Sequence, residues 1–123
     1  MNGPFVVQNR IRGTLVASNV RLADTPRSRR VGLLKHDRLE AGEGLWIVPT
    51  QAIHTFGMRF PIDVVFLDSR LFVKRIYPAL LPWRLTTFVW GAQSVLELPS
   101  GSLAGTGTMV GDQLQFCPGE GSE

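Results

Sequence analysis

The sequence predicts a single α+β domain of mostly antiparallel β-strands, arranged as a sheet, a sandwich or a partly open barrel, with one or two short helices. Three observations predict it. The chain has 123 residues, near the commonest size of one domain, and 44% of them are hydrophobic. Its apolar runs are short and separated by Gly and Pro. Its elements alternate too irregularly for a parallel doubly wound sheet. We expect one domain over residues 1–117 and a disordered tail over 118–123.

The N-terminal part predicts strand structure followed by a helix. Residues 11–22 contain enough β-branched side chains for one or two strands. Thr25 can accept a hydrogen bond from an amide of the first helical turn, and Pro26 suits the position where a missing N–H costs nothing. A helix is therefore expected to begin here and to end near Lys35.

The middle of the chain predicts a buried strand and a hairpin. Residues 45–48 form a short apolar run that a proline ends, which is typical of a buried strand. A second extended unit begins near Ile53. The polar turn at 68–70 then predicts a β-hairpin between residues 62–67 and 71–76.

Residues 77–91 lose the strand pattern, because two prolines forbid a regular central strand. Trp83, Phe88 and Trp90 nevertheless supply a large apolar area. We expect this segment to wrap on the core, since an exposed apolar patch is costly in a soluble monomer. The alternative is a lid or a loop that binds a partner.

The C-terminal part predicts two further strands. Residues 94–98 form an apolar run that Pro and Gly end, which is typical of a strand. A short helical turn is expected over residues 103–107. The last strand is expected over residues 113–116.

Charge and composition restrict the class of protein. The formal net charge is +3 and the arginine-rich segment 27–38 lacks aromatic stacking residues, so it predicts a solvated helix face rather than a nucleic-acid footprint. Apolar runs fall far short of the roughly 20 residues that span a bilayer, and no secretory h-region is recognisable. Cys117 is the single cysteine, so no internal disulfide can form. We expect a cytoplasmic protein without nucleic-acid or membrane partners; the oligomeric state stays open.

The segment 53–68, IHTFGMRFPIDVVFLD, holds the candidate site, because charged groups in apolar surroundings need partners. Strand alternation places Asp63 beside Val65 and Leu67. One interpretation is a ligand pocket with a polar floor and apolar walls. The floor would be His54, Thr55, Arg59 and Asp63, and the walls Trp46, Phe56, Met58 and Trp83. The other interpretation is a structural Arg59–Asp63 ion pair with His54 in the core.

Other chemistry finds less support in the sequence. The two histidines and the remote cysteine lack the close spacing of zinc ligands, so neither a metal nor a cofactor is expected. A metal site of His54 with Asp63, Asp68 or Glu97 remains an alternative. Glu97 stands between two leucines of a strand, and alternation predicts that it faces solvent. No GxSxG nucleophile motif is present.

Several ordered blocks resemble domain of unknown function 192, a widespread bacterial and archaeal family, over about residues 22–116. The blocks are Thr25, Pro26 and Arg29, then Gly32, Leu33 and Leu39, then 44–48, the segment 53–68, VLEL at 95–98 with Gly101, and 110–112. The chain departs from the pattern at Leu34, where methionine is common, at His36, where many relatives carry arginine, and at Thr50, where some carry cysteine. It also lacks the glycine that often follows Asp68. The resemblance implies a small single-domain α+β fold and no established activity.

The sequence leaves the function open between three hypotheses. The leading one is a domain that binds a small polar or anionic ligand, which a guanidinium would grip while His and Asp orient it. The second is a hydrolase or transferase with His54 as general base and Asp63 orienting it. The third is a protein-interaction module that uses the loop from Trp83 to Trp90.

Overall fold

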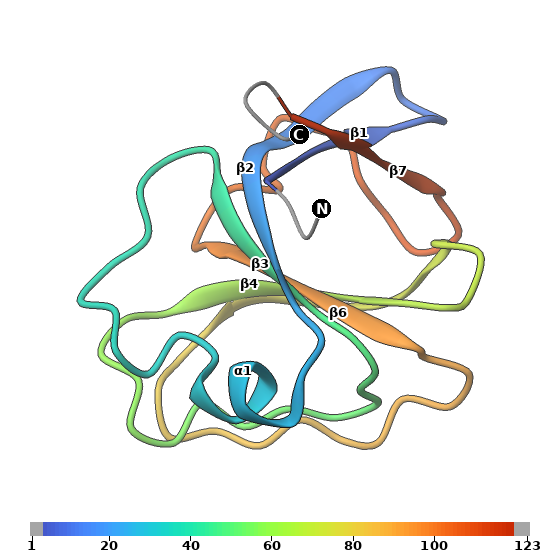
Figure 1. Cartoon of the computed structure of the whole chain (residues 1–123). Helices are drawn as coiled ribbons and strands as arrows, with labels where there is room; N and C mark the ends of the chain where they lie inside the picture. The colour runs from blue at the N-terminus through green and yellow to red at the C-terminus, as the bar shows by residue number, and fades with distance from the viewer. Residues whose placement is uncertain (1–3, 120–123) are drawn as a thin grey trace.

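The computed structural model describes residues 4–119, which form one curled sheet of seven strands and one short helix (Figure 1). The elements are β1 (Phe5–Asn9), β2 (Thr14–Ala23), α1 (Pro26–Val31), β3 (Glu43–Ile47), β4 (Ile62–Leu67), β5 (Val73–Leu80), β6 (Ser94–Pro99) and β7 (Leu114–Pro118). The strand order is β5-β4-β6-β3-β2-β1-β7, and every pair is antiparallel except β2 with β3. The predicted small, mostly antiparallel α+β fold is confirmed.

The sheet curls so far that its two edge strands approach each other. The Val73 N–H donates to the Asp112 carbonyl (2.7 Å), and the Leu114 N–H donates to the Leu71 carbonyl (2.9 Å). Phe72 and Gln113 pair between them as an isolated bridge. These contacts join the start of β5 to the start of β7. The sheet is thus a partly open barrel, one of the three arrangements that the sequence allows.

Two hydrophobic cores lie on opposite faces of this sheet. The inner core fills the concave face and contains Val65 and Leu67 of β4 and Leu96 and Leu98 of β6. The outer core lies under α1 and the loops. It takes the alternate residues of the same strands, with Val64 of β4 among them. Both faces of β4 and β6 are therefore buried, which explains why both strands are mostly apolar, with Asp63 in β4 and Ser94 and Glu97 in β6 as the polar members.

The helix begins where the sequence predicts and ends earlier. The Thr25 side chain accepts from the Ser28 amide, and the Ser28 hydroxyl accepts from the Thr25 amide, which forms a capping box. The helix ends at Val31 rather than near Lys35. Gly32 adopts a positive φ of 49°, and its N–H caps the Ser28 carbonyl. The turn there directs Leu33 into the outer core, where it is 3% exposed.

Four further expectations differ from the structure. The extended unit expected from Ile53 is a loop whose one isolated bridge pairs His54 with Leu85. Residues 103–107 form turns without a helix. The first strand, β1, has no counterpart in the sequence prediction. Its apolar run is short, and one of its two partner strands, β7, lies at the other end of the sequence. β7 extends to Pro118; residues 120–123 of the expected tail lie outside the described residues.

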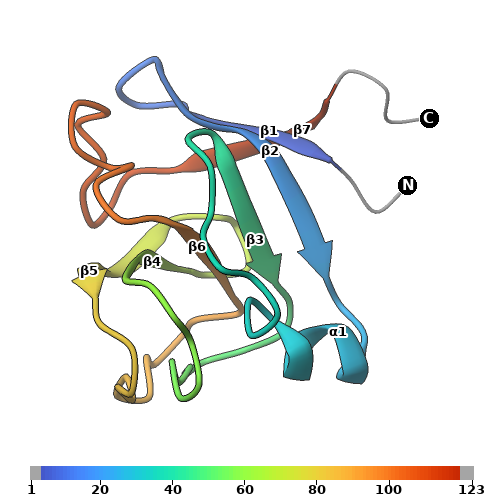
Figure 2. The same cartoon turned by 90° about the vertical axis from the view of Figure 1, so that its left-hand side faces the viewer.

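The large side chains of the 77–91 segment do not wrap on the core as expected. Trp83 is 66% exposed, Phe88 57% and Trp90 84%, whereas Val89 between them is buried. This segment lies with the loop after β3 at the end of the molecule that carries α1, and the β1–β2 turn lies at the opposite end (Figure 2). Over residues 4–119, no helix is long and apolar enough to cross a membrane.

Candidate ligand-binding site

The structure places Asp63 on the concave face of the sheet, beside Val65 and Leu67 as alternation predicts. Its carboxylate is buried and accepts three main-chain hydrogen bonds. Their donors are the amides of Ala79 (2.9 Å), Gly101 (3.1 Å) and Leu103 (3.1 Å). Asp63 therefore ties β4 to β5 and to the turn after β6, and its hydrogen-bonding capacity is largely used within the fold.

Arg59 and His54 have separate surroundings. Arg59 is exposed and pairs with the carboxylate of Asp37 rather than with Asp63. His54 is exposed, stacks on Phe56 with ring centroids 4.9 Å apart, and its Nδ1 accepts from the Phe56 amide (3.3 Å). A neutral imidazole with an accepting Nδ1 carries its proton on Nε2, so it offers a donor there and no free basic nitrogen. Among residues 4–119, no hydrogen bond or ion pair joins these side chains to Asp63.

The other proposed site residues have structural contacts as well. The Thr55 hydroxyl is buried; it donates to the Leu81 carbonyl (2.7 Å) and accepts from the Arg84 amide (2.9 Å), which fastens two loops together. Trp46 lies on the concave side, where its Nε1 donates to Ser94 Oγ (3.0 Å). Trp83 stacks on the exposed Phe56. A ligand-binding role for these residues stays a prediction.

A cavity of about 190 Å³ lies between the end of α1, the loop after β3 and the outer face of the sheet. Its walls are mainly apolar and include Ile47, Ile53 and Met58. His54 borders it as well, so two of the sequence-predicted site residues, His54 and Met58, lie at this cavity. Arg29 and Arg30, from the last turn of α1, also line it.

Sequence reasoning did not place Glu97 in the lining of this cavity. Alternation predicted that its side chain faces solvent, and that prediction is wrong: the residue is 4% exposed. The reason is that β6 lies between β4 and β3, with Val64 and Leu45 beside Glu97, and the outer face is covered by α1 and the loops. Glu97 is the acidic member of the cavity lining.

Burial raises the pKa of Glu97 from 4.5 to about 8, because a charged carboxylate loses its hydration there. Among residues 4–119, neither an ion pair nor a hydrogen bond counteracts this shift. The group is therefore a neutral carboxylic acid near pH 7, with an O–H donor and a carbonyl acceptor. A titratable group with a perturbed pKa at a cavity is a common mark of a functional site.

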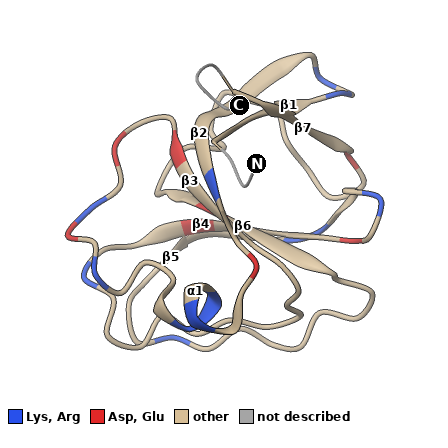
Figure 3. Cartoon of the chain, in the orientation of Figure 1, with Lys and Arg blue, Asp and Glu red and all other residues tan. Residues whose placement is uncertain are grey.

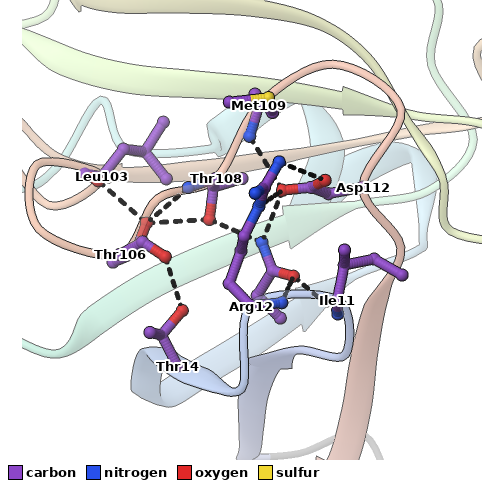
Figure 4. A network of polar contacts seen from close by, with 9 residues as sticks. Ile11, Arg12, Thr14, Leu103, Thr106, Thr108, Met109 and Asp112 are labelled. Atoms are coloured by element: carbon purple, nitrogen blue, oxygen red, sulfur yellow. Dashed lines mark hydrogen bonds and ion pairs between the residues drawn. The ribbon is translucent and has the colours of Figure 1, made fainter.

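A second polar cluster, at the other end of the molecule, has a structural role (Figure 4). Asp112 accepts from the guanidinium of Arg12 (3.0 Å), from the Asn9 amide group (3.0 Å) and from the Met109 main chain (3.1 Å). The Arg12 hydrogen bond is the main cause that lowers the pKa of Asp112. These contacts fasten the β1–β2 turn to the loop before β7. Sequence spacing gave no sign of this cluster, since its members lie about a hundred residues apart.

Among the described residues, no three His, Cys, Asp or Glu side chains are grouped closely enough to hold a metal ion. Glu97 and His54 line the same cavity without a third such ligand.

Comparisons with known proteins were consistent with one another. The family model DUF192, described as "uncharacterized ACR", matches residues 7–116, a longer stretch than the resemblance from residue 22 that the sequence blocks gave. A UPF0127 protein of Thermococcus sibiricus is 30% identical over 113 residues, covering 88% of this chain and 72% of the relative. A UPF0127 protein of Thermococcus kodakarensis is 30% identical over 125 residues, which cover 96% of this chain and 77% of the relative. The solved structure of a protein of unknown function from Novosphingobium aromaticivorans shares the fold, with a TM-score of 0.78 at 21% sequence identity. The match covers 91% of this chain and 83% of that chain.

Proposed function

The chain belongs to the DUF192 family, and from this premise we propose that its cavity beneath α1 binds a small polar or anionic organic ligand through the Glu97 carboxyl group. The family description assigns no activity, so the proposal rests on the geometry of this chain. It moves the candidate site from the neighbourhood of Asp63 to the opposite face of the sheet.

The observation that carries the proposal is a buried carboxyl group that borders a cavity and has no hydrogen-bond or ion-pair partner in the part of the chain that the structure describes. Buried polar groups in proteins nearly always have a hydrogen-bond partner. Glu97 is 4% exposed, and burial alone determines its pKa, with no hydrogen-bond contribution from a neighbour. Its hydrogen bonds are therefore available to whatever occupies the cavity. A purely structural role would be served better by an apolar side chain at this position.

The cavity also restricts the kind of ligand. An apolar cavity of about 150 Å³ accepts benzene, so a space of about 190 Å³ suits one small ring or a short branched chain. Ile47, Ile53 and Met58 would contact the apolar body of such a ligand. The neutral acid at Glu97 can donate to a ligand oxygen without repelling a negative charge, and the guanidinium of Arg30 at the cavity wall attracts a carboxylate or phosphate.

Benzoate is a suitable first probe, and its binding can be followed by NMR chemical shifts of the main-chain amides. We expect saturable shifts at residues that line the cavity and weaker binding in Arg30→Gln. Arg27→Gln is the matched control, because Arg27 is exposed on the same helix but does not line the cavity. Glu97→Ala should abolish the shifts. Equal affinities in native protein, Arg30→Gln and Glu97→Ala would refute the site.

Acid–base catalysis in the same cavity is a second candidate, favoured by the presence of a neutral Glu97 and His54 in one lining. In this case Glu97 would be the acid, and His54, the general base of the sequence hypothesis, would act only after its Nδ1 gives up the hydrogen bond from the Phe56 amide. Hydrolysis of para-nitrophenyl acetate is a direct test. A hydrolysis rate of the native protein above the rates of both Glu97→Gln and His54→Gln would support catalysis. Equal rates in the native protein and the two variants would exclude catalysis for this ester.

A further inference from the structure

The two loops at the α1 end of the molecule expose an unusual amount of apolar surface. We call this surface the aromatic platform. Its members are Phe56, Leu81, Trp83, Leu85, Phe88 and Trp90. Each is more than 40% exposed, and Trp90 is 84% exposed. Contiguous exposed apolar side chains of this size typically mark a site of interaction with another protein or a membrane.

The loops that carry the aromatic platform are held together by main-chain hydrogen bonds. The Thr55 N–H donates to the Arg84 carbonyl (2.8 Å), and the Val89 N–H donates to the Gln51 carbonyl (2.8 Å). Val89 is buried in the outer core and is 7% exposed, so the backbone directs its two neighbours, Phe88 and Trp90, to solvent. The exposure of these rings is therefore fixed by the fold of the loops.

Only positive charges accompany the aromatic platform on its own segments. Residues 48–62 and 73–93 contain no Asp or Glu, and they contain Arg59, Lys74, Arg75 and Arg84. Figure 3 shows further basic residues on α1, at the same end of the molecule. An acidic group from outside these segments, Asp37, pairs with Arg59. The remaining cations are free of ion pairs among the described residues.

Two of these cations lie close to the exposed rings. A Cβ at Gly91, next to Trp90, would lie 3.6 Å from Lys74 Cε. Arg75 packs over the ring of Tyr77 (4.6 Å), whose hydroxyl is 2.9 Å from the Thr87 hydroxyl, next to Phe88. Lys74 and Arg75 thus border the part of the aromatic platform that carries Phe88 and Trp90.

We propose that the aromatic platform docks on the surface of a lipid bilayer that contains anionic phospholipids. Trp, Phe and Leu side chains that project from the end of a molecule can enter the headgroup region, where Trp is favoured because its ring is both apolar and polar. Lys and Arg beside them interact with negative headgroups. This contact is peripheral and needs no segment that spans the bilayer. The expectation of no membrane partner was based only on the lack of spanning segments.

Charge complementarity favours an anionic bilayer over a second copy of the chain or a protein partner as the occupant of the aromatic platform. A second copy of the chain would bring the same cations face to face, which like-charge repulsion opposes. A protein partner would need an acidic surface with a complementary apolar hollow, whereas a fluid bilayer adapts to rings that project from loops.

Vesicle co-sedimentation tests the proposal. Vesicles of phosphatidylcholine with one quarter phosphatidylglycerol should retain the protein, vesicles of phosphatidylcholine alone should retain it less, and added salt should weaken the binding. The double variant Trp83→Ser, Trp90→Ser should lower the partition coefficient about tenfold or more, because binding scales with buried apolar area. The matched control is Ile11→Ser, Leu15→Ser, which removes two similarly exposed apolar side chains at the opposite end.

Each other outcome overturns the proposal. Binding that is absent, or that is lost equally in both double variants, would exclude the aromatic platform as a membrane contact. Sedimentation-velocity measurements that show self-association, removed by Trp83→Ser, Trp90→Ser, would identify a second copy as the occupant. Circular dichroism of both variants distinguishes lost binding from lost folding.

Discussion

Replacing Glu97 by glutamine tests the electrostatic character of the cavity through protein stability. Burial raises the pKa of Glu97 from 4.5 to about 8, so between these pH values folding requires the carboxyl group to take up a proton. The free energy of unfolding then falls by about 1.4 kcal/mol for each pH unit. The stability that the neutral Glu97 carboxyl group contributes is fully present below pH 4.5, and this contribution is lost as the pH rises from 4.5 to about 8. At pH 7 the loss is about 3 kcal/mol.

Glutamine has nearly the same shape and stays uncharged in both states. We therefore expect Glu97→Gln to unfold with a free energy about 3 kcal/mol higher than the native protein at pH 7 and with an equal value near pH 4. Urea denaturation from pH 4 to pH 9 measures this difference. Glu40→Gln, at an exposed carboxylate, is the control and should parallel the native protein. The reasoning is refuted if native protein and Glu97→Gln show the same dependence on pH.

Three further predictions concern the contacts that hold the sheet together. Asp63→Asn should lower the free energy of unfolding by about 1 to 3 kcal/mol in urea titration, because an amide NH₂ would face main-chain donors; an unchanged midpoint would contradict this. Asp112→Asn should be less stable at neutral pH. Because the Arg12 hydrogen bond lowers the pKa of Asp112 from 3.8, this gap should close as the pH falls below that value, and a persistent gap would count against an electrostatic cause. Gly44→Ala should cost about 1 to 3 kcal/mol in thermal unfolding, since its Cβ would lie 2.9 Å from Leu98 Cδ2; a native-like midpoint would show that the strands can separate.

Features determined by neighbouring residues could be predicted from the sequence. The helix start at Thr25 and Pro26 depends on the chemistry of one turn, and the structure forms it. The β4–β5 hairpin follows from two apolar runs around the Asp68 turn, and the Asp68 carboxylate accepts from the Arg70 and Phe72 amides within that turn. The face of β4 that carries Asp63 followed from alternation alone.

Features determined by distant residues could not be predicted in this way. Alternation predicts which β6 residues share a face, but it does not predict that both faces are buried. Glu97 was therefore assigned to solvent, although it lies in the cavity lining. Arg59 pairs with Asp37, twenty-two positions away, rather than with Asp63, four positions away. The short run at Phe5–Asn9 becomes a strand only because β2 and β7 pair with it on both sides. Tertiary context decided each of these cases.

The strands β4 and β6 contribute alternate residues to the cores on both faces of the sheet. Neither core can therefore melt while the other persists, since loss of β4 removes Val64 and Phe66 from the outer core and Val65 and Leu67 from the inner core. Residues 4–119 should unfold in one cooperative transition, and the amide hydrogens of β4 and β6 should exchange with solvent more slowly than those of the surface loops. A ligand that occupies the outer cavity would then slow exchange inside the barrel as well, although it does not touch that side.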